Sequence, residues 1–182
     1  LALSSVGLAN EPIKIGIIAP LTGGAASSGI HIRYGAEMAA DEINAAGGIN
    51  GRPIKLSIVD DAGIPAQSVS AMNKLVYQDK VDMVVGGNLS STVLAHMSIT
   101  ENAGIPYIVT SASNPYITRP ENKWLFRLHQ NDDIQSIHLA EMVVNNLKKT
   151  KIAVIHDTND FGTASKDAFV AALKDLGIEP LI

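Results

Sequence analysis

Short apolar runs rich in β-branched residues alternate with longer segments of helical periodicity along most of this chain. The run at 13–20 has the nearly continuous apolar character of a strand buried on both faces of a sheet, and further strands are predicted at 54–60, 82–87, 105–111 and 151–157. The helical segments place apolar or small side chains on one face, and they lie at 32–48, 66–78, 91–103, 132–148 and 162–176. This alternation predicts an α/β fold, a doubly wound parallel sheet with right-handed crossovers and helices on both faces. A further strand is expected to begin at 177–182.

The composition is that of a globular protein rather than of a disordered or nucleic-acid-binding one. The 182 residues are 46% hydrophobic and 18% charged, which is enough apolar material for a core. The net charge is −4, with no basic stripe, which argues against nucleic acid as a partner. There is no cysteine, so thiolate metal sites, thiol catalysis and disulfides are excluded.

The N-terminal stretch LALSSVGLA, residues 1–9, resembles the end of a secretory signal peptide. It is apolar, and Gly7 and Ala9 provide a small-x-small cleavage site after Ala9. We therefore expect an exported, periplasmic protein whose signal peptide is removed. The alternative is the N-terminal tail of an intracellular protein.

Ligands of open parallel sheets bind beyond the carboxyl ends of the strands, which directs attention to the loops at 22–30, 86–92, 110–115 and 157–162. The first loop has Gly24 and Gly29 at the spacing of a phosphate-binding loop, but Ile30 and His31 stand where Lys and Ser or Thr are needed. Ala25 likewise replaces the second glycine of the dinucleotide motif. This loop is either an anion-accepting helix start or a plain turn with a serine cap.

The loop GGNLSST at 86–92 lacks the lysine of a phosphate site, and Thr92 stands where a nucleophile elbow needs glycine. The nearest histidine, His96, lies two turns along the following helix and should point away from its start. Ser90 or Ser91 is most simply a helix N-cap. The functional alternative is that a ligand carboxylate shares the serine hydroxyl and the free N–H groups of this helix start.

A second hydroxyl cluster, formed by Thr110, Ser111 and Ser113, follows the adjacent predicted strand. Because neighbouring parallel strands bring their carboxyl ends together, both clusters are expected to face one small polar group. Local turns before Pro115 are the alternative. Phe161, in the last of the four loops, is either an apolar wall of the site or a residue that packs under its own loop.

No arrangement of residues predicts catalysis, a metal or a cofactor. A calcium loop beginning at Asp157 fails, because Phe161 and Ala168 occupy positions that need oxygen ligands. The five histidines show no ligand spacing. The carboxylate pairs Asp60–Asp61 and Asp132–Asp133 lie at strand or helix ends, where aspartate commonly caps or forms turns.

Several motifs together resemble the type I periplasmic solute-binding proteins of ABC importers, above all the branched-chain amino-acid (Leu/Ile/Val) binding group. These motifs are IKIGIIAPLTG, GAEMAADEINAAGGINGRPIKL, VVGGNLSST, GIPYIVTSASNP and IHDTNDFGTASKDAF, in that order. The resemblance runs from about Glu11 to the C-terminus, and DEINAAGGINGRPIKL is its most specific part.

The resemblance implies two lobes that clamp a ligand. Lobe one is expected at 11–123, a crossover or hinge at 124–131, and the incomplete first part of lobe two at 132–182. From the residues alone, 116–131 is either this crossover or a long surface loop with a short edge strand. With lobe two incomplete, residues 1–182 by themselves are expected to bind ligand weakly or not at all.

The resemblance also assigns roles to individual residues. Ser90 matches a serine that binds the ligand carboxylate, Ser111 a residue whose carbonyl accepts from the ammonium, and Ser113 a threonine that bonds the ligand through its hydroxyl and N–H. Leu89 flanks the side-chain pocket, and Ala112 is included in the same predicted site. Phe161 matches a tyrosine of lobe two that covers the ligand, and Ser28 stands where a relative carries tyrosine. The acidic partner of the ammonium is expected from a later part of the chain.

The expected function is that of a periplasmic receptor that closes around an aliphatic amino acid, without enzyme activity or cofactor. The expected partners are this small ligand and the membrane permease of an ABC importer. Alternatives are the same receptor for amides, urea, aromatic or fatty acids, and the effector domain of a transcription regulator. An enzyme that uses nucleotides is disfavoured because both glycine motifs fail.

Overall fold

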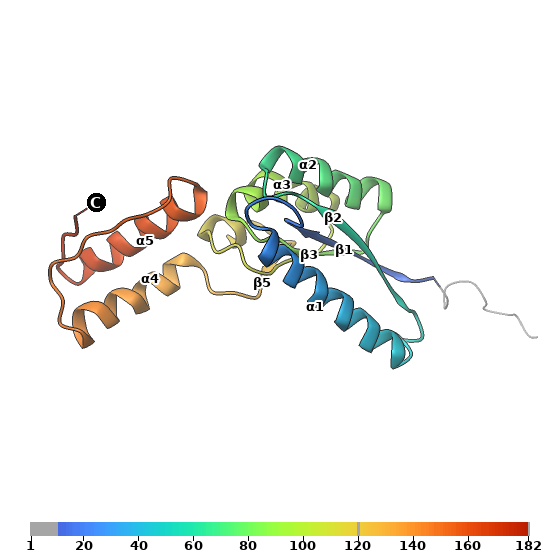
Figure 1. Ribbon diagram of the computed structural model, residues 1–182, viewed down its shortest axis with the longest axis horizontal. Helices are drawn as coiled ribbons and strands as arrows, with labels where there is room; N and C mark the ends of the chain where they lie inside the picture. The colour runs from blue at the N-terminus through green and yellow to red at the C-terminus, as the bar shows by residue number, and fades with distance from the viewer. Residues whose placement is uncertain (1–10, 120, 182) are drawn as a thin grey trace, which may run out of the picture.

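The computed structural model describes residues 11–119 and 121–181 as two bodies joined by an extended segment (Figure 1). The larger body contains a sheet and the helices that cover it. The smaller body consists of two long helices packed against each other and the segments that connect them. The predicted signal-peptide remnant at 1–9 lies outside the described residues.

The larger body is built on a five-stranded parallel sheet in the order β2-β1-β3-β4-β5, which confirms the predicted doubly wound α/β fold. The strands are β1 (Ile13–Ala19), β2 (Ile54–Asp60), β3 (Met83–Gly86), β4 (Tyr107–Val109) and β5 (Leu125–Arg127). The register pairs Ile18 with Gly86, Gly86 with Val109, and Val109 with Arg127. The carboxyl ends of four strands therefore form one line, and the loops that follow them emerge side by side.

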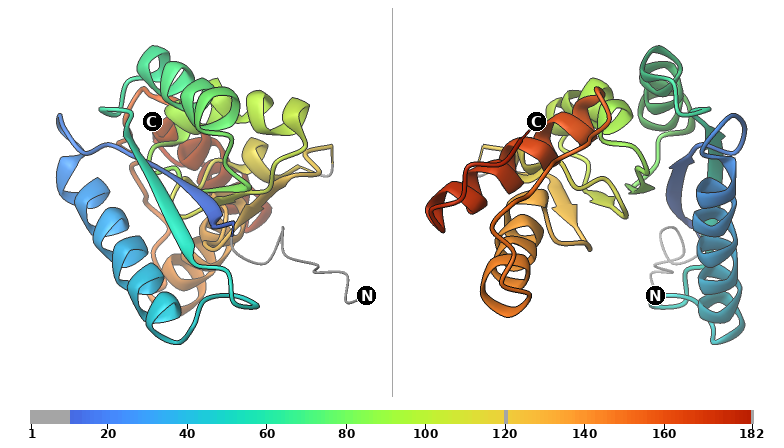
Figure 2. Two further views of the ribbon diagram at one scale, coloured as in Figure 1. Left: turned by 90° about the vertical axis from the view of Figure 1, so that its right-hand side faces the viewer. Right: turned by 60° about the vertical axis from the view of Figure 1, so that its left-hand side comes forward.

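Helices cover both faces of this sheet (Figure 2). They are α1 (Ala26–Ala45), α2 (Pro65–Asn73) with its π-helical continuation η1 (Lys74–Asp79), α3 (Ser90–Ala103) and the short 3-10 helix η2 (Pro115–Thr118). α1 lies on one face, and α2 and α3 lie together on the other. α1 begins at Ala26 rather than at Ile32, so part of the glycine-serine loop forms its first turns, and no side chain caps it.

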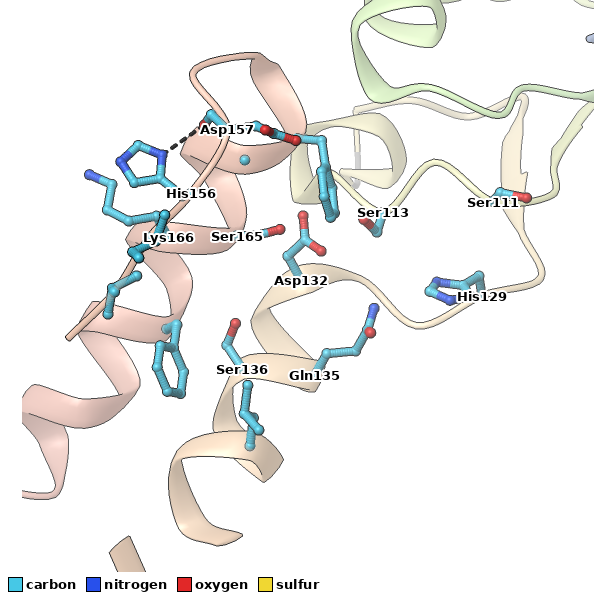
Figure 3. Close-up of a pocket in the computed structure, with 16 residues that line it drawn as sticks. Ser111, Ser113, His129, Asp132, Gln135, Ser136, His156, Asp157, Ser165 and Lys166 are labelled. Atoms are coloured by element: carbon cyan, nitrogen blue, oxygen red, sulfur yellow. Dashed lines mark hydrogen bonds between the residues drawn. The ribbon is translucent and has the colours of Figure 1, made fainter. Parts of the chain in front are cut away.

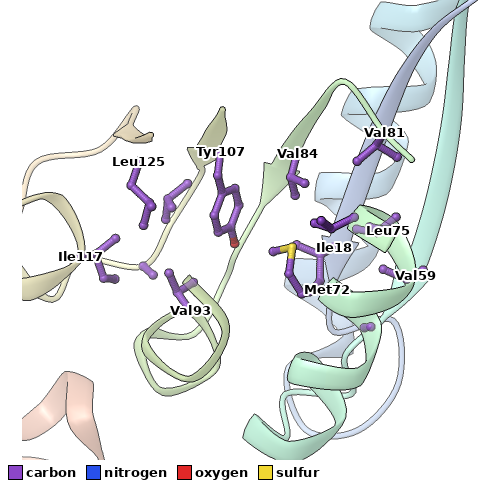
Figure 4. Close-up of a cluster of buried hydrophobic side chains, with 14 residues drawn as sticks. Ile18, Val59, Met72, Leu75, Val81, Val84, Val93, Tyr107, Ile117 and Leu125 are labelled. Carbon is purple, nitrogen blue, oxygen red and sulfur yellow. The ribbon is translucent and has the colours of Figure 1, made fainter. Parts of the chain in front are cut away.

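The main hydrophobic core lies between the sheet and the layer of α2 and α3 (Figure 4). Its largest side chains are fully buried and come from separate elements: Ile18, Met72, Leu75, Val84, Val93, Tyr107 and Ile117. Strand β1, in the interior of the sheet, contributes a nearly continuous apolar run, because both of its faces are covered. Burial of one such side chain stabilises the fold by about 1.5–3 kcal/mol.

A buried polar cluster joins α2, α3 and β4 inside this core. The Nδ1 atom of His96 lies 3.0 Å from Ser68 Oγ, and its Nε2 atom lies 3.1 Å from the hydroxyl of Tyr107. The Ser68 hydroxyl donates to backbone oxygens, those of Pro65 at 3.0 Å and Thr92 at 3.1 Å. His96 therefore carries its proton on Nδ1 and accepts from Tyr107, and its side chain faces the core rather than the start of α3.

The smaller body contains α4 (Asp132–Glu141), its π-helical continuation η3 (Met142–Asn146) and α5 (Asp160–Asp175), packed around Ala140, Ala172 and Leu173. The predicted strand at 151–157 is not formed. Only Ala153 pairs, in a single parallel bridge with Leu181. A ladder needs several consecutive pairs, and within 121–181 Leu181 alone forms a β-bridge with this segment.

The segment 116–131 contains features of both interpretations made from the sequence. Residues Leu125–Arg127, which were assigned to the crossover, form β5 at the edge of the first sheet, so that sheet extends beyond Lys123. The chain then passes from Arg127 to α4 of the smaller body (Figure 1). One segment is thus both an edge strand and the connection between the two bodies.

The turn after β3 generates the first prediction. Gly87 has φ +78°, and a Cβ at this position would clash with the Tyr107 hydroxyl and lie 2.7 Å from Val93 Cγ2. Gly51 has nearly the same φ, +77°, but nothing within 4 Å of a Cβ. Gly51→Ala should lower the free energy of unfolding by about 1 kcal/mol through backbone strain alone, and Gly87→Ala by roughly 1–3 kcal/mol more. Urea denaturation of the full-length protein measures both values, and equal losses would contradict the packing argument.

The second prediction concerns pH. Burial lowers the pKa of His96 from 6.5 to about 3. Below pH 6.5 the unfolded chain binds a proton that the folded protein does not, so stability is lost as the pH falls. His96 should account for about 1.4 kcal/mol of lost unfolding free energy per pH unit between roughly pH 6 and pH 4.

His96→Gln is the matched variant for this prediction, because it removes the titration and keeps a polar side chain. It should be less stable than the wild type at pH 7 by about 1–3 kcal/mol, since Ser68 and Tyr107 lose a partner. Its stability should then fall less steeply with pH in urea denaturation at pH 7, 6 and 5. Parallel pH dependences would contradict the prediction.

Candidate functional site

Helix α3 starts at the carboxyl end of β3, directly after the pair Gly86–Gly87. Leu89 has extended backbone angles, φ −98° and ψ 136°, and is the N-cap residue without a side-chain cap hydrogen bond. The first helical bond runs from the Val93 N–H to the Leu89 carbonyl at 3.1 Å. The expectation that Ser90 or Ser91 caps the helix is therefore wrong, because the chain is already helical at Ser90.

The Ser90 side chain instead connects α3 to the loop after β4. Its Oγ atom accepts from the Asn114 N–H at 3.3 Å, and the residue is 2% exposed. Accepting this bond leaves the hydroxyl proton of Ser90 available to another acceptor. The first N–H groups of a helix also lack intrahelical partners, and the helix dipole favours negative charge beside them. This helix start can therefore accept an anionic group.

The second hydroxyl cluster surrounds the end of β4. Thr110 uses both its N–H and its hydroxyl on the Gly86 carbonyl, at 2.7 and 3.1 Å, so it fastens the two strand ends together. The Ala112 N–H donates to the Gly87 carbonyl at 3.2 Å. Ser111 and Ser113 remain beside a cavity. The structure thus brings the two clusters together, with Thr110 as structural support and the two serines beside open space.

A small cavity of about 290 Å³ lies where the two bodies meet, near the lower limit of about 300 Å³ for small-molecule sites. Its lining comes from three segments: Asn88, Leu89, Ser90 and Ser91 at the start of α3, Ser111, Ala112 and Ser113 after β4, and Asp157, Asn159 and Phe161 before and in α5. A larger cavity of about 740 Å³ continues between α4 and α5 (Figure 3). Ser111, Ser113, Asp157 and Phe161 line both cavities.

Six of the seven predicted site residues therefore line the small cavity, and their roles in binding remain predictions. Phe161 is 45% exposed and faces the cavities from α5, as an apolar wall does. Ser28 is the exception. It is exposed in the first turn of α1 and lines neither cavity.

Asn114 is a central residue of this site that the sequence did not reveal. It is 4% exposed, and its Nδ2 atom donates to the Asp160 carbonyl of α5 at 3.0 Å, which links the two bodies directly. Arg127 holds the same loop by donating to the carbonyls of Ala112 at 3.3 Å and Asn114 at 2.9 Å. Burial lowers the pKa of Arg127, and the charges of Asp132 and Asp133 oppose that shift. The Asn-Pro pair indicates a turn, but no local signal indicates a contact with Asp160.

The aspartate pair at the end of β2 stabilises a turn outside these cavities, as expected. Asp60 Oδ1 accepts from the N–H groups of Leu21 at 2.7 Å and Ala62 at 2.8 Å. Burial opposes ionisation of Asp60, but these hydrogen bonds and one from Thr22 hold its pKa below the usual value. Burial raises the pKa of Asp61, which is fully buried.

Among residues 11–119 and 121–181, no group of three or more His, Cys, Asp or Glu side chains is arranged to hold a metal ion. Within the same residues, no helix is long and apolar enough to cross a membrane.

Comparison with known proteins gives one consistent family. The periplasmic binding protein family model matches residues 12–182. An amino acid binding protein of Pseudomonas aeruginosa is 41% identical over all of this chain and half of its own length. The Leu/Ile/Val-binding protein BraC3 of Rhizobium johnstonii is 36% identical over all of this chain and 49% of its own. The chain thus spans about half the length of the curated relatives it matches.

Solved structures agree with the sequence relatives. The branched-chain amino acid transporter substrate binding protein LivJ of Streptococcus pneumoniae, in complex with isoleucine, matches with TM-score 0.85 and 30% identity over 94% of this chain and 48% of its own. A solute binding protein of an ABC transporter from Rhodopseudomonas palustris, in complex with 3,4-dihydroxybenzoic acid, matches with TM-score 0.81 and 26% identity over 94% of this chain and 46% of its own. The fold, the sequence match and the cavity between two bodies agree, and the chain belongs to the periplasmic binding protein family.

Proposed function

We propose that this protein is a solute receptor of an ABC importer and that it binds an aliphatic amino acid by closing two lobes around it. The observation that carries the proposal is the small cavity at the junction of the bodies. There, the start of α3 and the serines after β4 face Phe161 and Asp157 of the smaller body. A ligand in this cavity touches both bodies, so it stabilises the closed arrangement relative to the open one.

The ligand carboxylate is proposed to lie at the start of α3, against the free N–H groups and the Ser90 hydroxyl. The Ser111 carbonyl and the Ser113 hydroxyl then lie beside the amino group, and Leu89 and Ala112 contact the aliphatic side chain. Phe161 covers the ligand from the second lobe. We assign no direct contact to Ser28, which lies outside the cavities.

The two lobes are proposed to follow the two bodies. Lobe one is the region from Glu11 through Lys123 together with its edge strand β5, and lobe two begins with α4. The segment between Arg127 and α4 contains the hinge. The Asn114–Asp160 hydrogen bond crosses between the lobes and limits the directions in which they can open.

Export to the periplasm and delivery of ligand to a membrane permease are part of the same proposal. The match to the periplasmic binding protein family supports export, and the similarity to a solute binding protein of an ABC transporter supports delivery. We propose binding without chemistry, because the Ser90 hydroxyl contacts the Asn114 N–H while His96 bonds Ser68 and Tyr107.

A second ligand class has one observation in its favour. The Rhodopseudomonas palustris neighbour holds 3,4-dihydroxybenzoic acid, which has a carboxyl group but no amino group. The start of α3 accepts a carboxylate of either class. Amino acids carry an amino group that these carboxylic acids lack. Binding experiments with ligands of both classes therefore distinguish them.

The ligand assignment generates the third prediction. A ligand that binds only the folded state stabilises it by about 2.7 kcal/mol at a concentration of 100 Kd. Leucine, isoleucine or valine should therefore raise the melting temperature of the full-length protein in a thermal-shift screen. The screen also contains urea, short amides, aromatic acids and fatty acids. Stabilisation by those compounds alone would refute the amino-acid assignment.

The fourth prediction tests Ser90. Ser90→Ala should weaken leucine binding by about 10-fold or more, because a hydrogen bond to a charged group contributes about 1.5–3 kcal/mol. Stability without ligand should fall by only about 0.5–1.5 kcal/mol, since the Asn114 N–H loses its partner. Calorimetric titration and urea denaturation measure the two effects.

Ser98→Ala is the control, because Ser98 is exposed on the same helix and lines neither cavity. It should change neither leucine affinity nor stability appreciably. If Ser90→Ala lowered stability and affinity by the same free energy, Ser90 would have only a structural role.

A further inference from the structure

Asp61 is a fully buried carboxyl group in the turn between β2 and α2. Its Oδ1 atom accepts from the Gly63 N–H at 2.9 Å, and its backbone N–H donates to the Ala19 carbonyl at 3.1 Å. Its Oδ2 atom is also buried, and it has no hydrogen-bond partner among the described residues. None of the ion pairs formed within 11–119 and 121–181 includes Asp61. A buried carboxylate oxygen without a donor or a cation is costly, so this atom needs a physical explanation.

The Thr92 hydroxyl, in the first turn of α3, is a neighbour of Asp61 that has no proton to offer. Thr92 lies close enough for hydrogen bonding to act on the pKa of Asp61. Its hydroxyl, however, donates to the Leu89 carbonyl at 2.9 Å. Since a hydroxyl has one proton, Thr92 can then only accept a bond from the side of Asp61. An ionised carboxylate also only accepts, so two acceptors would face each other without a proton between them.

The buried polar cluster next to Asp61 has no free donor for it either. The Tyr107 hydroxyl lies near enough that the charge of Asp61 adds to the effect of burial, which raises the pKa of Tyr107. That hydroxyl donates to His96 Nε2 at 3.1 Å, and His96 uses its Nδ1 proton on Ser68. Ser68 in turn donates to backbone carbonyls. Each proton of this cluster is therefore already used.

The elements around Asp61 bring no cation to it. α2 and β3 contain no ionisable side chain. The lysines of β1 and β2, Lys14 and Lys55, lie near the opposite ends of their strands, and Glu101 lies near the far end of α3. Burial raises the pKa of Asp61 and the charge of Asp60 adds to this shift, although hydrogen bonds to the carboxyl group oppose it. Burial and a neighbouring negative charge both favour the neutral acid.

A proton on Oδ2 completes the hydrogen bonds at the start of α3. The neutral acid donates to the Thr92 hydroxyl, and Thr92 donates to the Leu89 carbonyl. This chain of bonds holds the first turn of the helix from the side opposite the small cavity, which Leu89 and Ser90 line. Gly63 of the same turn also packs here, since a Cβ on it would lie 3.0 Å from Leu89 Cδ1. The state of Asp61 therefore acts on the helix start that faces the ligand.

We propose that Asp61 carries a proton in the ligand-binding form of the receptor and that, as a neutral acid, it is a positioning residue for the start of α3. This inference rests on the proposed function, in which this helix start holds the ligand carboxylate. Ionisation of Asp61 removes the donor to Thr92 and places a negative charge behind the first turn. That charge competes with the ligand carboxylate for the positive end of the same helix dipole. Ligand affinity therefore falls when Asp61 loses its proton.

Stability without ligand gives the first measurement. Because the pKa of Asp61 is raised in the folded state, the folded protein retains a proton that the unfolded chain has already released. The stability that this proton contributes is present in acid and is lost as the pH rises through the folded-state pKa. Asp61→Asn keeps a donor and cannot ionise. In urea denaturation of the full-length protein from about pH 5 to pH 8, it should gain stability relative to the wild type as the pH rises.

Asp60→Asn is the matched control, because it removes a carboxylate from the same turn. Burial opposes the ionisation of Asp60, but hydrogen bonds hold its pKa below the usual value. Asp60 is therefore ionised throughout this pH range, and Asp60→Asn should be less stable than the wild type by the same amount at each pH. The two adjacent aspartates thus give opposite expectations, a difference that changes with pH for Asp61 and a constant one for Asp60.

Leucine affinity gives the second measurement, which a purely structural role would not move with pH. Calorimetric titration of the full-length wild type should show affinity falling by about 5-fold or more from pH 5 to pH 8, the effect of a charge beside a partly buried helix start. Asp61→Asn should keep the affinity that the wild type has in acid, and Asp60→Asn should follow the wild type. By reciprocity, leucine binding should take up protons in the wild type and not in Asp61→Asn, as measured in buffers of different ionisation enthalpy.

The outcomes separate the inference from the proposed function. Carboxyl-carbon NMR of the wild type reports the proton directly, with the Asp61 signal assigned by its absence from Asp61→Asn. An Asp61 signal that is already that of the ionised form at about pH 5 would overturn the inference and leave the amino-acid receptor intact. Leucine affinities of the wild type and Asp61→Asn that change in parallel with pH would do the same. A wild type that binds no amino acid at any pH would overturn both the proposed function and the role of Asp61 in it.

Discussion

The close approach of β3 to β1 and β4 at the pair Gly86–Gly87 is the constraint on which the site depends. At this point the carbonyls of both glycines accept hydrogen bonds from the loop after β4, and Tyr107 and Val93 pack against Gly87. A side chain at Gly87 would separate these elements, which would move the start of α3 away from Ser113. Gly86 and Gly87 are therefore required by packing.

Asn114 connects the first body to the second through hydrogen bonds. Its N–H reaches Ser90, its carbonyl receives Arg127, and its side chain reaches the Asp160 carbonyl. One buried residue thus positions the proposed carboxylate site and contacts the opposing lobe. The Asp132 N–H of α4 donates to the Ser113 carbonyl at 3.0 Å, so the start of the smaller body is also tied to the loop after β4.

Local patterns predicted the strands and helices of the first body well, because burial on both faces leaves an unmistakable apolar run, as in β1. They failed where pairing with distant residues decides whether a segment becomes a strand, and where backbone angles decide which residue begins a helix. Residues 151–157 have a strand-like sequence, yet Leu181 alone pairs with them. Leu125–Arg127 resembled part of a crossover, but pairing with β4 makes it a strand. The serine start of α3 suggested an N-cap, but the extended angles of Leu89 shift the cap by one residue.

The sequence by itself determined the parallel α/β fold, the four loops worth inspecting and the absence of cysteine chemistry, because these follow from local periodicity and residue type. It also placed Ser90, Ser111 and Ser113 at neighbouring strand ends. Only the tertiary structure decided which hydroxyls face open space, since Thr110 is used by the Gly86 carbonyl. It alone showed that Asn114 connects the two bodies and that the buried Oδ2 atom of Asp132 has no hydrogen-bond partner. The burial of a side chain and its hydrogen-bond partners depend on residues distant in the chain, so a local sequence pattern cannot predict them.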